Sequence, residues 1–132
     1  MIITKNNYVE KAENAIIELK NKKNRMGKTV PMVTTSKIRN ILAMSAQIYN
    51  DVLGVIGDEL SEDINARIDY LKLRIIYEVG RDTTNSVRNF VESAELIKCI
   101  EQINGSRENY RLFNNYMEAL VAYRKFYGGK DE

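Results

Sequence analysis

An apolar repeat between residues 64 and 79 is the feature that most limits the folds open to this chain. Ile64, Ile68, Leu71, Ile75 and Val79 follow one another at intervals of four, three, four and four residues. This spacing places all five side chains on one face of an α-helix. The segment is therefore predicted to be an amphipathic helix that packs through this face.

Helix breakers are rare over the rest of the chain as well. The 132 residues include one proline and seven glycines, and 44% of them are hydrophobic. This length supports one hydrophobic core and is short for two. We expect an all-α fold: one domain over residues 1–132, a compact bundle of about five helices with a basic loop at 21–33.

The five helices are predicted from apolar periodicity and from residues that favour helix ends. Hydroxyl caps are expected near Thr34, at Ser61 and at Ser106, and glycine ends are expected at Gly80 and at Gly128–Gly129. The apolar register of the fourth helix shifts near Glu95, which would bend it. The expected helices span residues 8–20, 34–52, 64–80, 87–103 and 106–128.

Several classes of function lack the residues that they need. The chain has no histidine, no tryptophan and one cysteine, Cys99, which lies in an apolar helical context and is expected to be a buried, unreactive thiol. Zinc sites of Cys and His, disulfides within the chain and histidine-dependent hydrolases are excluded. Nucleotide-binding glycine motifs are missing and the carboxylates form no catalytic pair, so we expect no catalytic residue, no metal, no cofactor and no enzyme activity.

No apolar stretch approaches the length of about twenty residues that a membrane span requires, and the N-terminus lacks the pattern of a signal peptide. The sequence therefore predicts a cytoplasmic protein.

A second pattern alternates arginine with tyrosine on the predicted third helix. Arg67, Tyr70, Arg74, Tyr77 and Arg81 are separated by three, four, three and four residues, so they share one narrow face. We call these five residues the arginine–tyrosine stripe. Guanidinium groups bind phosphates and tyrosine rings stack on sugars or bases, so the stripe suits RNA or single-stranded nucleic acid. The alternative is that the arginines are solvated and the tyrosines are half buried against a neighbour.

The apolar residues Leu73 and Ile76 lie outside the packing face of the same helix. They leave open a helix covered from more than one side, which would bury the tyrosines.

Charge is unevenly divided along the chain, although the net charge is only +2. Basic residues, without any acid, fill the stretch from 20 to 39, and acidic residues dominate from 51 to 69. Such a division can attract a phosphate backbone at one pole and can stack copies of the chain pole to pole. The alternative for the loop is a solvated, lysine-rich segment.

Lys37 and Arg39 lie in the first turn of the predicted second helix, where cations oppose the helix dipole. Free backbone N–H groups, hydroxyls and two cations together would form a phosphate cradle. The alternative is a simple capped helix start with two exposed cations.

Three ordered blocks carry a resemblance to a known family. They are Thr34–Arg39, Tyr70–Arg81 and Glu118–Lys130, of which the Ala-Leu-Val-Ala-Tyr segment in the last block is the most specific. The chain resembles the small helical subunit of type III-A CRISPR effector complexes, the Csm complex, over nearly its whole length. The resemblance implies a non-catalytic subunit whose copies stack head to tail beside the backbone and large subunits and line the groove where guide RNA pairs with target RNA.

The resemblance also implies which residues contact RNA. Lys37, Arg39, Arg74 and Arg81 would contact phosphates. Tyr77 would pack on a ribose, Arg124 and Lys125 would extend the basic surface, and Tyr123 would pack inside the bundle. Lys72 lies across the helix from Arg74 and would join only if the groove is wide. An architectural adaptor, whose basic surface meets acidic protein neighbours, is the alternative, and the role of the lysine-rich loop at 20–28 is left open.

Overall fold

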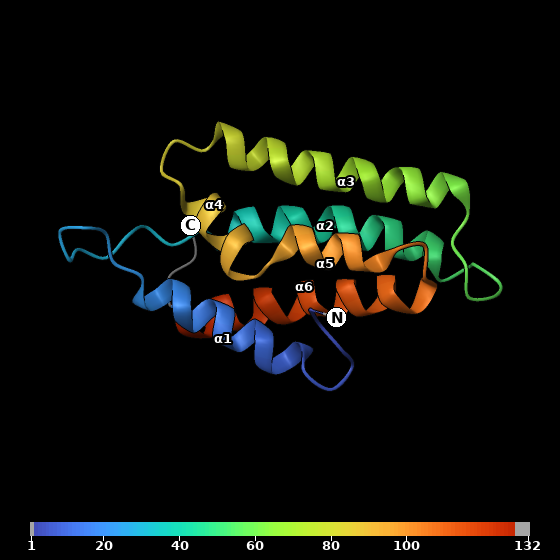
Figure 1. Cartoon of the computed structure of the whole chain (residues 1–132), viewed down its shortest axis with the longest axis horizontal. Coiled ribbons are helices and arrows are strands. Elements are labelled where there is room, and N and C mark those ends of the chain that lie inside the picture. Colours follow the sequence, from blue (N-terminus) through green and yellow to red (C-terminus); the bar gives the residue numbers. More distant parts are fainter. Residues whose placement is uncertain (1, 129–132) are drawn as a thin grey trace.

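The computed structural model describes residues 2–128, and these residues form an all-α fold of six helices, as predicted in class (Figure 1). Within this range the only extended pairings are two isolated bridges, between Lys23 and Thr29 and between Glu59 and Ser106. The helices are α1 (Tyr8–Asn21), α2 (Thr35–Val52), α3 (Glu62–Arg81), α4 (Ser86–Ser93), α5 (Leu96–Ile103) and α6 (Arg107–Gly128).

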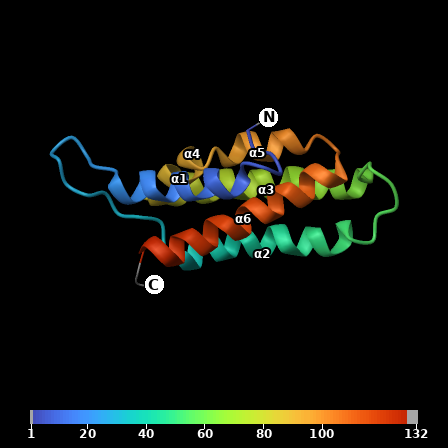
Figure 2. The same ribbon diagram turned by 90° about the horizontal axis from the view of Figure 1, so that it is seen from below.

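The long helix α6 organises the bundle because it packs against α1, α2 and α5. Helix α3 packs on α2, α4 and α5 and forms an outer ridge of the molecule (Figures 1 and 2). The loop at 22–34 lies at one end of the bundle, and the loop at 53–61 lies at the opposite end. Because α2 begins at the first of these ends and α3 begins at the other, the start of α2 lies near the end of α3.

Aromatic side chains of α6 fill the centre of the core, and their polar atoms are bonded. The hydroxyl of Tyr110 donates to the carbonyl of Ser45 at 2.7 Å, and the hydroxyl of Tyr116 donates to the carbonyl of Ala94 at 2.8 Å. Both rings are buried, and burial raises the pKa of Tyr110 to about 12. A buried hydroxyl without a partner would destabilise the core, so these bonds fix how α2 and α4 sit against α6.

The predicted hydroxyl caps are confirmed. Thr34 Oγ1 accepts from the backbone N–H of Lys37 at 3.2 Å, and Ser61 Oγ accepts from that of Ile64 at 3.2 Å. Ser106 Oγ likewise accepts a backbone N–H at 3.1 Å near the start of α6. Helix α3 continues through Gly80 to Arg81, so the expected end at Gly80 is one residue early. Gly129 lies outside the described residues.

The predicted fourth helix is two helices, so the expected count of five is wrong. The backbone of Glu95 has a φ of 52°, in the left-handed region, and this residue separates α4 from α5. The break lies where the apolar register shifts, which allows Phe90 of α4 and Ile100 of α5 both to be buried. Glu95 also pairs with Lys11 at 3.6 Å and with Lys98 at 3.8 Å.

Cys99 of α5 is buried, as expected, and burial raises the pKa of its thiol to about 12. The thiol is therefore protonated at neutral pH, which makes it a poor nucleophile. Over residues 2–128, no helix is long and apolar enough to cross a membrane.

Candidate nucleic-acid interface

A groove of about 330 Å³ runs between the first half of α2 and the last half of α3. Three residues predicted to contact phosphate line it together: Lys37 from α2, and Arg74 and Arg81 from α3. Local helix geometry explains the two arginines, which are seven residues apart and so share a face. The packing of α2 on α3 then brings Lys37 to the same groove. The other lining residues are Asn40, Ile41, Met44, Glu78 and Val87.

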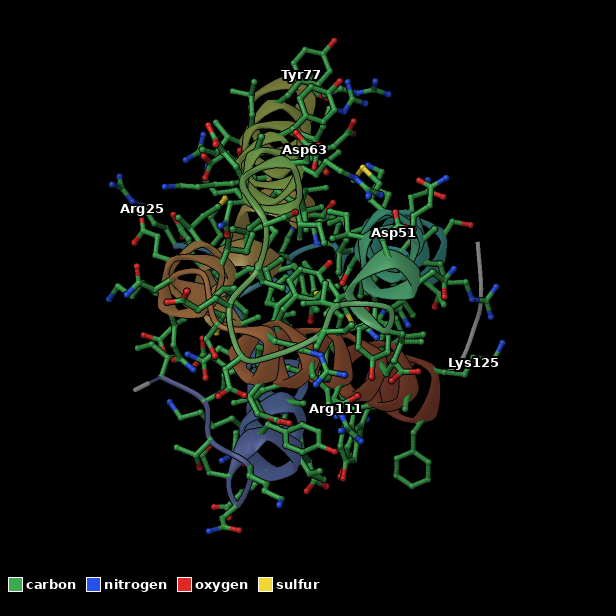
Figure 3. The ribbon with its side chains drawn as sticks, turned by 90° about the vertical axis from the view of Figure 1, so that its right-hand side faces the viewer. Arg25, Asp51, Asp63, Tyr77, Arg111 and Lys125 are labelled. Carbon is green, nitrogen blue, oxygen red and sulfur yellow. The ribbon has the colours of Figure 1, made fainter. Side chains whose placement is uncertain are left out.

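Tyr77 lies beside both groove arginines. Its ring centroid is 5.3 Å from the Arg74 guanidinium carbon and 6.0 Å from that of Arg81, which are cation–π distances. The side chain lies at the outer edge of the α3 ridge and points away from the other helices (Figure 3). The arrangement offers a flat ring flanked by two cations, which suits a sugar or base next to its phosphates.

The tyrosines of the stripe are exposed. Tyr70 is 60% exposed and Tyr77 is 54% exposed, values that fit the half-buried alternative as well as rings that face a nucleic acid. Leu73 and Ile76 are exposed as well. The chain therefore covers α3 on one side only. The possibility that α3 is covered from more than one side, which the sequence left open, does not hold for these residues.

Glu78 is shared by the two groove arginines. Its carboxylate lies 3.5 Å from Arg74 Nη2 and 3.5 Å from Arg81 Nε. Partly exposed pairs of this length contribute little free energy, so they orient the two guanidinium groups without holding them tightly. A phosphate that binds the two arginines would compete with the Glu78 carboxylate. The sequence analysis missed Glu78, although its position four residues after Arg74 and three before Arg81 could have revealed it.

Asp82, the residue that follows α3, contacts Lys37 beside the groove. Its carboxylate accepts the backbone N–H of Val87 at 2.8 Å, the backbone N–H of Thr84 at 3.1 Å and the hydroxyl of Ser86 at 3.0 Å. These bonds hold the pKa of Asp82 well below its usual range, and the bond from the Val87 N–H lowers it the most. The ionised group caps α4 and lies 3.8 Å from Lys37 Nζ. Asp82 thus positions Lys37 as well as capping α4.

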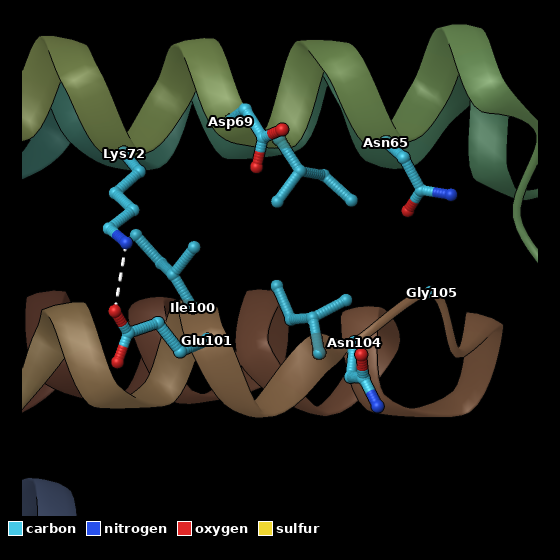
Figure 4. Close-up of a pocket in the computed structure, with 9 residues that line it drawn as sticks. Asn65, Asp69, Lys72, Ile100, Glu101, Asn104 and Gly105 are labelled. Atoms are coloured by element: carbon cyan, nitrogen blue, oxygen red, sulfur yellow. Dashed lines mark hydrogen bonds and ion pairs between the residues drawn. The ribbon is translucent and has the colours of Figure 1, made fainter.

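Lys72 lies outside the groove. Its Nζ is 2.8 Å from Glu101 Oε2 on α5, across a different cavity of about 400 Å³ between α3 and α5 (Figure 4). Because positions 72 and 74 are separated by about 200° around the helix, the two cations point to opposite sides of α3. The structure therefore separates Lys72 from Arg74, as the helix geometry predicted.

Arg39 is exposed on α2 but does not line the groove, because two residues of helix turn it away from Lys37. Arg67, the first member of the stripe, is ion-paired with Asp51 at the far end of α2. Lys125 is exposed at the C-terminal end of α6 (Figure 3). Tyr123 stacks on Tyr127 with ring centroids 6.2 Å apart and is partly buried against the core, as expected.

The expectation that Arg124 extends the exposed basic surface is wrong. Arg124 is only 5% exposed, and its Nε donates to the carbonyl of Val33 at 2.7 Å. The guanidinium fills the space over Gly128, where an added Cβ would collide with Nη1. Arg124 therefore ties the end of α6 to the end of the basic loop instead of facing solvent.

The unequal distribution of charge along the sequence becomes a difference between the two ends of the bundle. The basic stretch lies in the loop at 22–34 and the start of α2, and the acidic stretch lies at the end of α2, in the loop at 53–61 and at the start of α3 (Figure 1). Asn24 gives the basic loop a turn of its own, since its side chain accepts the backbone N–H groups of Met26 at 2.9 Å and Lys28 at 3.0 Å.

The fold and the groove define a small all-α protein with three cations and an exposed tyrosine gathered at one groove between two helices. Among the described residues, no three His, Cys, Asp or Glu side chains are placed to hold a metal ion.

Comparison with known proteins gives the family. The sequence model of the family described as Csm2 Type III-A matches residues 10–130. A Streptococcus thermophilus protein named CRISPR system Cms protein Csm2 is 39% identical over 132 residues, which cover 98% of each chain. A protein of the same name from Mycobacterium tuberculosis (strain CDC 1551 / Oshkosh) is 33% identical over the whole of both chains, and one from Enterococcus italicus is 36% identical over 97 residues, or 72% of this chain and 68% of the relative. The chain belongs to the Csm2 family of type III-A CRISPR systems. It is a subunit of the Csm complex, whose other subunits are its partners.

Proposed function

We propose that this chain is a non-catalytic small subunit that binds the backbone of guide RNA and target RNA, without sequence specificity, in cytoplasmic antiviral defence. The observation that carries the proposal is the convergence of Lys37, Arg74 and Arg81 on one groove beside the exposed ring of Tyr77. No cofactor is part of this function.

The chemistry of the groove favours backbone contacts over base reading. Lys37, Arg74 and Arg81 supply positive charge and donors for phosphate oxygens, and Tyr77 supplies a surface for a ribose. Contacts to phosphate and sugar fix position but carry no sequence information. Base pairing between guide and target would supply the specificity, as in other RNA-guided complexes.

The opposite charges of the two ends support head-to-tail stacking of copies. In such a stack the basic loop end of one copy meets the acidic end of the next, and the grooves line up along the RNA. One copy contacts few phosphates, so stacking would multiply weak contacts into stable binding.

A salt titration of RNA binding to the assembled complex tests the proposal. We expect the Arg74→Ala/Arg81→Ala double variant to reduce the slope of log K against log salt by about 0.7 to 0.9 for each lost contact, equally for RNAs of different sequence. Lys98→Ala is the matched control, since Lys98 is an exposed cation of α5 outside the groove. An unchanged slope in the double variant, or an equal change in the control, would contradict the proposal.

The architectural adaptor is the second candidate, and Glu78 is the observation that favours it. This carboxylate already lies near both groove arginines, which leaves less positive charge for RNA. If the double variant retains RNA in the complex while fewer copies of the subunit are incorporated, the adaptor explains the surface better. Mass spectrometry of the purified complex counts the copies in the same samples.

A further inference from the structure

The cavity of about 400 Å³ between α3 and α5 is separate from the groove between α2 and α3. Ile68 of α3 and Ile100 and Ile103 of α5 line it, and each of the three is at most 5% exposed, so the floor of the cavity is the apolar core. Polar side chains line the rest of it: Asn65, Asp69, Lys72, Glu101 and Asn104. An apolar floor below a few polar groups is the usual form of a binding pocket.

Lys72 shows which kind of side chain fits this cavity. Its Nζ lies 2.8 Å from Glu101 Oε2, and its aliphatic part runs beside Ile100 at one end of the cavity (Figure 4). Long cationic side chains lay their stems on apolar surface and keep the charge at a polar rim. The other end of the cavity, between Asp69 and Asn65 on α3 and Asn104 after α5, is open (Figure 4).

The charge around the cavity is unbalanced and negative. Asp69 is exposed, and no hydrogen bond or ion pair reaches its carboxylate from residues 2–128. Helix α5 ends at the cavity with no basic residue in its last turn, and Glu101 in that turn adds to the negative end of the helix dipole. Lys72 pairs with Glu101 and so leaves the charge of Asp69 unanswered. The cavity therefore favours a cation that comes from outside the chain.

We propose that this cavity receives an arginine side chain from another protein subunit of the Csm complex. The guanidinium would donate to the Asp69 carboxylate and to Asn65 Oδ1, since Asn65 Nδ2 already donates to the carbonyl of Leu60 at 3.3 Å. The stem of the arginine would lie on Ile68 and Ile103, which line the cavity. A planar guanidinium with five donors can bind two separate acceptors at once, which suits this site better than an ammonium group does.

The same chemistry argues against RNA as the occupant. A phosphate in the cavity would meet Asp69, Glu101 and the negative end of α5, and all three would repel it. The cavity also lies on the other side of α3 from Arg74, because positions 72 and 74 point to opposite sides of the helix. The inference rests on membership in the Csm complex and not on the proposed RNA binding, which the Arg74 and Arg81 variants test separately.

Photo-crosslinking in the assembled complex tests which molecule occupies the cavity. A photo-reactive lysine analogue that keeps its ammonium group would replace Lys72, which lines the cavity. Irradiation should crosslink the chain to a different protein subunit, and mass spectrometry should place an arginine within a few residues of the crosslinked position. Crosslinks to RNA or to a second copy of this chain, or no crosslink at all, would overturn the proposal.

Charge reversal tests the pairing. When the complex is reconstituted from its other subunits, Asp69→Lys should raise the chain concentration for half-maximal incorporation about 30-fold or more, because the arginine would face a like charge. Glu118→Lys is the matched control, since Glu118 is an exposed acid of α6 outside the cavity, and it should shift that concentration by less than about threefold.

Circular dichroism checks that both variants are folded. Replacement of the crosslinked arginine by aspartate in the partner subunit should restore incorporation of Asp69→Lys, because the opposite charges then face each other with their positions exchanged. An unchanged concentration for folded Asp69→Lys, an equal rise in the control or a failure of this rescue would overturn the proposal.

Discussion

Both faces of α3 carry large apolar side chains, but the two faces have opposite surroundings. The inner face, with Ile68, Leu71 and Ile75, is buried against the bundle, whereas Leu73 and Ile76 on the outer face are about half exposed. Both faces satisfy the same helical periodicity, so the backbone alone does not distinguish them. The difference shows that apolar periodicity in the sequence predicts a helix but does not say which of its apolar side chains the rest of the chain covers.

The largest effect on this comparison is expected from a cavity under the inner face. Ile75→Ala should lower the free energy of unfolding by about 3 kcal/mol, because Ile75 is 0% exposed and its removal leaves unfilled space. Leu73→Ala, the matched change on the outer face, should alter it by less than about 0.5 kcal/mol in dilute protein. Urea unfolding measures both. Equal losses from the two changes would mean that the outer face is covered within the chain.

The next effect is expected at the residue that ends α3. Asp82→Asn should lower the free energy of unfolding at neutral pH by about 1 to 2 kcal/mol, because the ionised carboxylate caps α4 more strongly than a neutral amide does. The pKa of Asp82 is lowered by folding, so the stability that it contributes is present above its ordinary pKa of 3.8 and is lost as the pH falls below that value.

Unfolding experiments between about pH 6 and pH 2 check the sign, because a lowered carboxyl pKa acts in that range. The wild-type chain should lose its advantage over Asp82→Asn as the pH falls. An advantage that grows with acidity would contradict the assignment.

A smaller effect on folding is expected from the groove arginines. Arg74→Ala should change the free energy of unfolding by less than about 0.5 kcal/mol, because its pair with Glu78 is 3.5 Å long and only partly buried. The same variant should weaken RNA binding by the complex measurably. A large loss of stability would assign Arg74 to the packed part of α3 and would weaken the contrast between the faces.

The smallest effect is expected at Lys72. Lys72→Met removes the ion pair with Glu101 but keeps most of the aliphatic side chain, so the free energy of unfolding should change by about 0.5 kcal/mol or less. The salt slope of RNA binding should not change, since Lys72 lies on the other side of α3 from the groove. A reduced slope would extend the interface to the α5 side.

Local signals explain what the sequence predicted correctly. The apolar repeat at 64–79 and the caps Thr34 and Ser61 depend on residues within one or two helical turns, so they can be read without the fold. The register shift near Glu95 was visible for the same reason. Whether it gives a bend or two helices depends on how Phe90 and Ile100 are buried, which requires the neighbouring helices.

The site residues also divide into those that local spacing predicts and those whose surroundings depend on distant parts of the chain. Arg74, Tyr77 and Arg81 were placed together by spacing alone. Arg124 was expected only to extend the basic surface, and the group that covers it is the loop carbonyl of Val33, which is distant in sequence. No local pattern distinguishes a buried arginine from an exposed one when the covering group is so far away.

The sequence by itself determined the helical class, the helix positions to within a few residues, and the chemistry of the stripe, because these follow from the 3.6-residue period and from side-chain type. Only the tertiary structure decided that Lys37 joins the arginines while Arg39, Lys72 and Arg124 do not. The physical reason is that a groove between two helices depends on which faces they turn toward each other. Side-chain packing across the whole bundle sets that orientation.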